Sequence, residues 1–114
     1  MYDDRLKEEI EKTPVRLFQR ALIKEWDYQK GLPENGVWLF CFSQVLKNVL
    51  RLSDRQKIRF RLEEVNPQDL VAEIFKEIDH QQNLMETEQG KRTNFYRPFC
   101  SLIWAVLERA QDGN

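Results

Sequence analysis

The sequence predicts an all-α protein, a single compact bundle of four to five helices with two apolar central helices. Apolar residues recur at helical spacing in most segments, which is the pattern of amphipathic helices. Signals for helix starts occur at Thr13-Pro14, at Ser53 with Gln56, and at Asn66-Pro67. We assign residues 1–114 to one helical domain, because a chain of 114 residues forms a single hydrophobic core.

The N-terminal third predicts one weak helical segment and one strong helix. Residues 1–12 are highly charged and offer only Leu6 and Ile10 at helical spacing, so we expect a loose N-terminal arm or a short helix. Thr13-Pro14 is read as the N-cap and first residue of a helix that runs to about Lys30. Its apolar face carries Val15, Phe18, Ala21, Leu22 and Trp26. Gly31 is expected to supply a left-handed C-terminal cap.

The first of the two central helices is predicted from Val37 to Leu52, with Val37 to Leu50 as its core-forming part. Its first six residues, Val37 to Phe42, are apolar on every side, and on their own they would also fit a buried strand. Val45, Leu46, Val49 and Leu50 continue the pattern at helical spacing. We therefore predict a helix that other helices surround.

Residues 53–65 are compatible with both a helix and a strand. Ser53 and Gln56 form the capping-box pattern of a helix start. Ile58, Phe60 and Leu62 alternate with charged residues as in a half-buried strand, while Ile58, Leu62 and Val65 fit a helical face equally well. The residue types favour a helix, because Arg, Gln, Lys, Leu and Glu are good helix formers.

The C-terminal half predicts two further helices separated by a polar loop. Asn66-Pro67 begins a helix whose apolar stripe is Leu70, Val71, Ile74, Phe75 and Ile78 and whose acidic side chains are expected to point to water. Residues 81–94 are polar and predict a helix tail and a mobile loop. The last helix is expected to begin near Arg97-Pro98 and to form the second central helix over Phe99 to Leu107, with Trp104 buried.

Charge is segregated in the middle of the chain. Lys47 to Arg61 carries six bases and one acid, whereas Leu62 to Gln89 carries eight acids and one base, in a chain of net charge −1. Such blocks indicate helices that pair by charge or a surface that docks a partner. The candidate interaction residues are Arg51, Arg55, Lys57, Arg59, Arg61, Asp69, Glu73 and Glu77.

Chemistry-bearing patterns are scarce, so we predict no enzyme, no metal site and no cofactor. His80 is the only histidine, and a closed zinc site needs four ligands with paired spacing. Cys41 and Cys100 lie in apolar segments, where they are expected to pack as free thiols, with a disulfide as the less favoured alternative. The four glycines form no phosphate-binding loop.

These observations favour a small protein–protein interaction or adaptor module able to associate with itself or with another protein. The alternative is a nucleic-acid backbone-binding protein that uses the Arg51 to Arg61 block. It is disfavoured because Asp69, Glu73 and Glu77 in the next helix would repel phosphate. We expect no membrane association and a cytoplasmic location, because no apolar run approaches ~18 residues and the N-terminus resembles no signal sequence.

Overall fold

The structure is a computed structural model that describes residues 2–34 and 36–112. Its helices are α1 (Tyr2–Glu11), α2 (Val15–Gly31), α3 (Gly36–Leu50), the 3₁₀ helix η1 (Arg55–Lys57), α4 (Ile58–Glu64), α5 (Pro67–Leu84), α6 (Gly90–Thr93) and α7 (Tyr96–Gln111). The all-α class is confirmed for the described residues. The seven α-helices outnumber the four to five predicted, because α1 and the short α6 are also formed.

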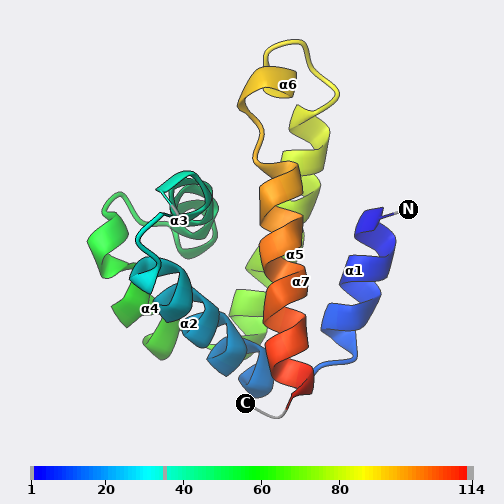
Figure 1. Cartoon of the computed structure of the whole chain (residues 1–114). Coiled ribbons are helices and arrows are strands. Elements are labelled where there is room, and N and C mark those ends of the chain that lie inside the picture. Colours follow the sequence, from blue (N-terminus) through cyan, green and yellow to red (C-terminus); the bar gives the residue numbers. More distant parts are fainter. Residues whose placement is uncertain (1, 35, 113–114) are drawn as a thin grey trace.

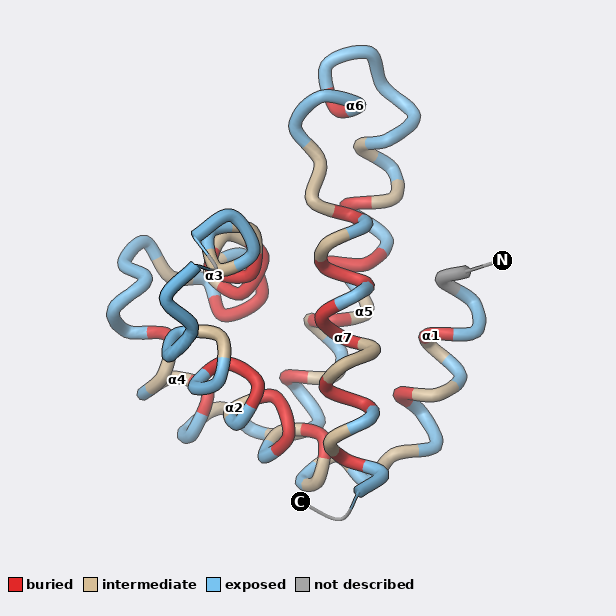
Figure 2. Tube along the Cα trace, viewed as in Figure 1, coloured by how far each residue is buried: buried red, intermediate tan, exposed pale blue. Residues whose placement is uncertain are grey.

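Helix α7 lies at the centre of the fold, with α5 running beside it (Figure 1). Helix α1 packs against one side of this pair, while α2, α3 and α4 lie on the other side. The buried side chains of all these helices join in one hydrophobic core, and Figure 2 shows the buried residues along the facing sides of α2, α5 and α7. Of the predicted central pair, α7 buries side chains from Tyr96 to Ala110, whereas α3 buries side chains only from Phe42 onward.

Helix α1 is the short helix of the two predicted alternatives. Leu6 and Ile10 are both fully buried against the core, so two aliphatic side chains one turn apart are enough to dock this charged segment. Lys7 also forms an ion pair with Asp79 of α5. The loose-arm alternative is therefore wrong for the described part of this segment.

The predicted caps of α2 are wrong at both ends. The Thr13 hydroxyl donates to the Glu9 carbonyl of the preceding helix, so Pro14 occupies the N-cap position and the helix begins at Val15. At the other end Gly31 is still helical, and Leu32 ends the helix with extended backbone. A left-handed backbone occurs instead at Arg51, where φ is 57°.

Residues 55–64 form a helix, which settles the choice between helix and strand. Asp54 caps η1, because its carboxylate accepts the backbone N–H of Gln56 at 2.9 Å, so the predicted Ser53 cap is wrong. Ile58 and Leu62 of α4 are buried. Gln19 of α2 donates to the carbonyls of Leu62 and Val65, both at 2.9 Å, and so satisfies two acceptors at the C-terminal end of α4.

The Asn66 cap of α5 is confirmed, since its side chain accepts the backbone N–H groups of Gln68 and Asp69. Beyond α5 the polar segment is more ordered than predicted. Gln81 is buried and its side-chain oxygen accepts the backbone N–H of Phe95 at 2.7 Å. A Cβ atom at Gly90 would overlap the Leu84 carbonyl, so this turn requires glycine.

Two further expectations concern single side chains. Trp104 of α7 is only half-buried, which corrects the prediction of a buried residue, and the fully buried tryptophan is Trp26 of α2. Cys41 and Cys100 are both thiols, as the favoured interpretation predicted. In the part of the chain that the structure describes, no helix combines the length and the apolar character needed to cross a membrane.

Candidate interaction surfaces

The bases of the central block are largely neutralised within the fold. Arg51 lies 3.4 Å from Glu73 of α5, Arg59 lies 2.9 Å from Asp27 of α2 and 2.6 Å from Glu63, and Arg61 lies 2.9 Å from Glu64. Arg55 and Lys57 are exposed and have no ion-pair partner among the described residues. Within residues Arg51 to Arg61, three bases are therefore paired and two are unpaired.

The acidic candidates are divided in the same way. Asp69 is exposed in the first turn of α5, and Glu73 binds Arg51 and Lys76. The expectation that all these carboxylates point to water is wrong for Glu77, which is buried between α3 and α5. Its oxygen accepts hydrogen bonds from Asn48 at 3.1 Å and from Gln81 at 2.7 Å. Glu77 therefore joins these two helices and the segment before α7.

The basic and acidic blocks do not pack on each other as two helices. Helix α4 packs against α2 and α3, and the link from the basic block to α5 in the described structure is the exposed Arg51–Glu73 pair. Exposed ion pairs of this kind contribute at most about 1 kcal/mol each. Whether the blocks bind a partner stays a prediction.

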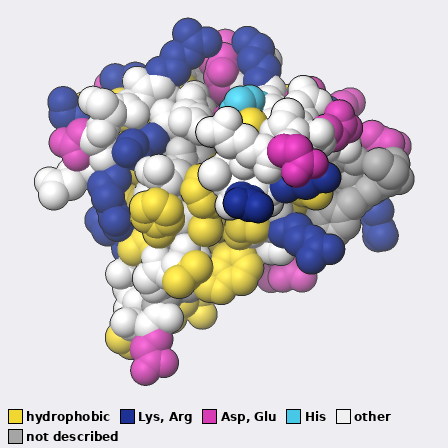
Figure 3. All heavy atoms as spheres, turned by 90° about the horizontal axis from the view of Figure 1, so that it is seen from above, with side chains coloured by type: hydrophobic (Ala, Val, Ile, Leu, Met, Phe, Trp, Pro, Cys, Tyr) yellow, Lys and Arg dark blue, Asp and Glu magenta, His cyan; other side chains and the backbone are white. Residues whose placement is uncertain are grey.

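The first turns of α3 expose large apolar side chains that the sequence predicts to be covered. Val37 is 78% exposed, Phe40 52% and Trp38 46%. Tyr28 and Leu32 at the end of α2 are exposed nearby. Figure 3 shows hydrophobic side chains gathered in the middle of the face seen from above, with Lys and Arg side chains around them.

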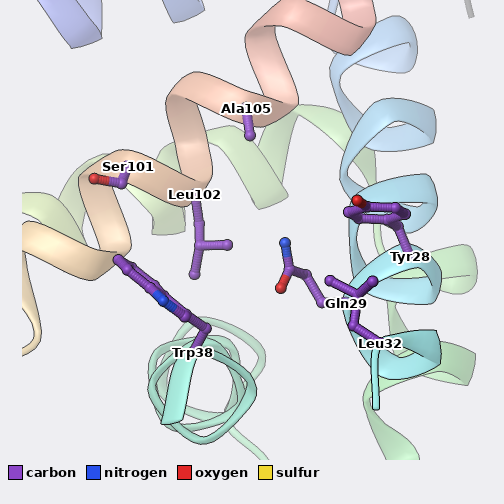
Figure 4. Close-up of a pocket in the computed structure, with 7 residues that line it drawn as sticks. All are labelled: Tyr28, Gln29, Leu32, Trp38, Ser101, Leu102 and Ala105. Atoms are coloured by element: carbon purple, nitrogen blue, oxygen red, sulfur yellow. The ribbon is translucent and has the colours of Figure 1, made fainter. Parts of the chain in front are cut away.

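A pocket of about 350 Å³ opens between the end of α2, the start of α3 and α7 (Figure 4). Its lining residues are Tyr28, Gln29, Leu32, Trp38, Ser101, Leu102 and Ala105. Trp38 extends from α3 toward Leu102 of α7, while the Gln29 side chain reaches into the space between the helices. Val37 and Phe40 do not line the pocket, and the Phe40 ring packs edge-on against Phe95, with 6.1 Å between the ring centroids. We call the pocket, together with these two exposed side chains on the first turns of α3, the apolar groove.

A buried charge pair lies beside the apolar groove. Glu25 of α2 is almost completely buried, and its carboxylate is 2.7 Å from the guanidinium of Arg109 in α7. Gln29 donates a hydrogen bond to the same carboxylate, and Arg109 lies over the Tyr28 ring at 5.0 Å from its centroid. This pair holds α2 and α7 in register, and thereby fixes two of the three walls of the groove.

The groups with catalytic potential are not brought together. His80 is exposed at the polar side of α5, as predicted. Burial raises the pKa of the Cys41 thiol, which makes it less reactive. Within residues 2–34 and 36–112 no group of three or more His, Cys, Asp or Glu side chains is placed to hold a metal ion.

Sequence reasoning did not find the apolar groove, although its signal was present. The segment Val37 to Phe42 is apolar on every side, and a helix of that kind is either surrounded or bound to a partner. The sequence pattern was interpreted as that of a surrounded helix. The structure covers Phe42 and leaves Val37, Trp38 and Phe40 in contact with solvent.

Comparisons with protein-family models, with curated proteins and with solved structures found no match for this chain. The function is therefore argued from the surfaces described above.

Proposed function

We propose that this chain is a protein–protein interaction module that associates with a second copy of itself through the apolar groove. The observation that carries the proposal is the exposure of Val37, Trp38 and Phe40 beside a pocket whose walls come from three helices. Contiguous apolar surface on a soluble protein marks an interaction site when it is large and bordered by polar residues. Scattered apolar side chains would need no such explanation.

The exposed area supports a docking role. Tyr28, Trp38 and Phe40 are each about half exposed. At roughly 200 Å² for a fully exposed aromatic side chain, these three residues leave about 300 Å² of mainly apolar surface uncovered, before Leu32, Val37 and the pocket floor are added. The largest patch on a typical monomer measures about 300–600 Å² and is often functional. Aromatic residues are also the usual anchors of protein interfaces.

The charges along α7 favour a second copy as the occupant. Arg97, Ser101, Ala105 and Glu108 lie at helical spacing on one side of α7, and Ser101 and Ala105 line the groove. Arg97 and Glu108 are exposed and have no ion-pair partner in the described part of the chain. If two α7 helices pair antiparallel with Ser101 and Ala105 at the centre of the contact, Arg97 of each copy lies next to Glu108 of the other. A two-fold interface requires such reciprocal contacts.

This interface has the arrangement expected of a dimer contact. The small side chains of Ser101 and Ala105 allow the two α7 helices to approach, the aromatic side chains of the groove fill the space beside them, and opposite charges fix the register. We place the module in the cytoplasm, supported by the two cysteine thiols, which suit a reducing compartment. No catalytic role is part of the proposal.

Analytical ultracentrifugation combined with light scattering tests the proposal. The wild type should dimerise in a concentration-dependent manner, and Trp38→Ala or Phe40→Ala should shift the equilibrium strongly toward monomer. Phe60→Ala is the matched control, because Phe60 is an exposed aromatic residue on α4, outside the groove. It should leave the dimer unchanged.

Charge exchange tests the register directly. Arg97→Glu and Glu108→Arg should each weaken self-association, because each places like charges opposite one another. The variant with both substitutions, and an equimolar mixture of the two single variants, should recover it, since both restore two opposite-charge pairs. A wild type that remains monomeric at every measurable concentration would overturn the proposal, as would single variants that dimerise as well as their mixture.

A further inference from the structure

We propose that α2 and the η1–α4 segment form a second binding face, which takes the phosphate backbone of single-stranded nucleic acid and stacks one base on Phe60. This inference is independent of self-association, because it uses a different side of the molecule. It also differs from the sequence-based alternative, in which the Arg51 to Arg61 block was the binding element.

The outward side of α2 carries most of the face. Arg16, Arg20 and Lys24 recur every four residues on the side of α2 opposite its buried residues, and Lys30 follows near the end of the helix with its ammonium over the Trp26 ring; all four bases are exposed. None has an ion-pair partner among the described residues. From Arg16 to Lys30 the stripe covers about 21 Å at 1.5 Å per residue, which is long enough to follow several phosphates of a nucleic-acid strand.

The η1 segment extends this stripe. Arg55 and Lys30 both line a pocket of about 580 Å³, together with Trp26 and Gln56. A second pocket of about 380 Å³ is lined by Arg16, Gln19 and Arg20. Each pocket thus has two cationic side chains and one amide on its walls, and neither is lined by a carboxylate.

The acids on this face are already engaged. Asp27 and Glu63 both bind Arg59, and this arrangement holds α4 against α2. Asp54 accepts the backbone N–H of Gln56 as the cap of η1. Asp27, Glu63 and Arg59 together carry one net negative charge, and Asp54 adds a second. Against these stand six Lys and Arg side chains without an ion-pair partner in the described part of the chain: Arg16, Arg20, Lys24, Lys30, Arg55 and Lys57. The face is therefore strongly positive on a chain of net charge −1.

The acidic residues that argued against nucleic acid lie elsewhere. Asp69, Glu73 and Glu77 belong to α5, and Glu77 is buried against α3. Figure 3 shows mainly Lys and Arg side chains, with Asp or Glu among them, along the left edge of the molecule, on the side where Figure 1 places α4. The repulsion expected from α5 is therefore reduced for a strand bound along α2, because Glu77 is buried and Glu73 is paired with Arg51 and Lys76, while Asp69 keeps its exposed charge.

Phe60 gives the face its preference for single strands. Phe60 is 68% exposed on α4 and lies one turn after Lys57, so its ring and the Lys57 side chain share a side of the helix. Proteins that bind single strands combine a basic track with aromatic rings on which unpaired bases stack. A base within a duplex offers no free face to Phe60, and an acidic protein surface gains nothing specific from the basic track and ring together.

Fluorescence anisotropy with a labelled 15-nucleotide oligo(dT) tests the inference, with the matching duplex and polyglutamate as competitors. Binding should weaken with salt at a slope of about −3 in log K against log[salt], as expected for four phosphate contacts to a single strand. The duplex and polyglutamate should compete poorly. Equal competition by the duplex or by polyglutamate would overturn the proposal, as would a salt slope near zero.

Two double variants distinguish binding at this face from a general effect of the chain's total charge. Arg16→Gln with Arg20→Gln should reduce the magnitude of the salt slope by about 1.4, since two phosphate contacts are lost. Lys76→Gln with Arg92→Gln is the control of equal charge change, because both residues are exposed and belong to α5 and α6, and it should leave the slope unchanged. Equal losses in the two double variants would show a non-specific charge effect and refute the site.

The stacking residue has its own reciprocal control. Phe60→Ala should weaken oligo(dT) binding about 5- to 150-fold, the range that corresponds to the loss of one base–aromatic stack. Phe40→Ala should leave binding of this short strand unchanged, although it weakens self-association under the proposed function. Thermal melting of each variant shows whether it is folded. A folded Phe60→Ala chain with unchanged affinity would rule out the stacking role.

Discussion

Replacing Arg109 by methionine tests the buried charge pair that holds α2 and α7 together. The Glu25 side chain is only 4% exposed and the Arg109 side chain 31%, and their charged atoms are 2.7 Å apart. Methionine keeps the apolar stem of the arginine and removes its charge. The substitution leaves a carboxylate buried without its cation, which is the costly half of breaking such a pair.

The magnitude follows from the contacts that are lost and kept. Removing one partner of a fully buried pair costs about 3–5 kcal/mol. Arg109 is partly exposed and Gln29 still donates to Glu25, so we expect losing this pair to cost less than that range, about 2 kcal/mol. Loss of the guanidinium over Tyr28 adds about 0.5–1 kcal/mol. The total of about 3 kcal/mol corresponds to a fall in Tm of roughly 10 °C.

Urea unfolding followed by circular dichroism measures this free energy. Lys24→Met is the matched control, since Lys24 is exposed on α2 next to Glu25, and it should change stability by less than about 0.5 kcal/mol. Arg109→Met combined with Glu25→Leu should recover most of the loss, because no unpaired charge then remains buried. A loss below about 1 kcal/mol for Arg109→Met alone would refute this reasoning, since that is the range of exposed pairs.

Three further predictions concern single residues. Trp26→Ala should cost about 3–5 kcal/mol in urea unfolding because the side chain is fully buried, and Trp104→Ala should cost clearly less because Trp104 is half-buried; equal costs would contradict the burial described. Asn66→Ala should cost about 1 kcal/mol in the same measurement, since it removes the acceptor of two N–H groups at the start of α5, and no loss would show that the cap is dispensable. Burial raises the pKa of the Cys41 thiol, so its stability contribution is present below the pKa of the unfolded thiol and is lost as pH rises through the raised folded value. Alkylation of Cys41 by iodoacetamide in a Cys100→Ala chain should accordingly have its midpoint at a higher pH in the folded than in the unfolded state; a lower midpoint would contradict the shift.

Helix starts were predicted correctly where the capping side chain binds backbone groups only a few residues away. The Asn66 cap was identified from sequence because the N–H groups it accepts follow within three residues. The caps at Thr13 and Ser53 were misplaced, since a hydroxyl group can choose between several nearby backbone groups. The Thr13 hydroxyl binds back to Glu9, and Asp54 takes the role expected of Ser53.

Burial was harder to predict, because it depends on which helices pack on which side. The apolar run of α3 has the same composition at Phe42, which is buried, and at Phe40, which is exposed. The opposite error was made for Glu77, which was predicted to be exposed and is buried. It lies at the edge of the apolar stripe of α5, and the approach of α3 with Asn48 turns that edge into a buried hydrogen-bonded site.

The basic face was missed for a different reason. Its bases on α2 are four or more residues apart and alternate with core residues, so they form no block in the sequence. The contiguous bases from Arg51 to Arg61 were predicted as the alternative nucleic-acid site, yet in the fold three of them form ion pairs with acidic residues. Helical spacing of Arg16, Arg20 and Lys24 was the available signal.

The fluorescence of Trp38 as the only tryptophan tests the central claim most directly. In a Trp26→Phe, Trp104→Phe chain, Trp38 reports on the groove wall that it forms. We predict red-shifted emission and strong quenching by acrylamide in dilute solution, where the chain is monomeric, and blue-shifted, protected emission at high concentration. The same chain with Arg97→Glu should remain quenched at both concentrations. Quenching of Trp38 that is independent of concentration in the chain with Arg97 intact would contradict a groove that is covered by a second copy.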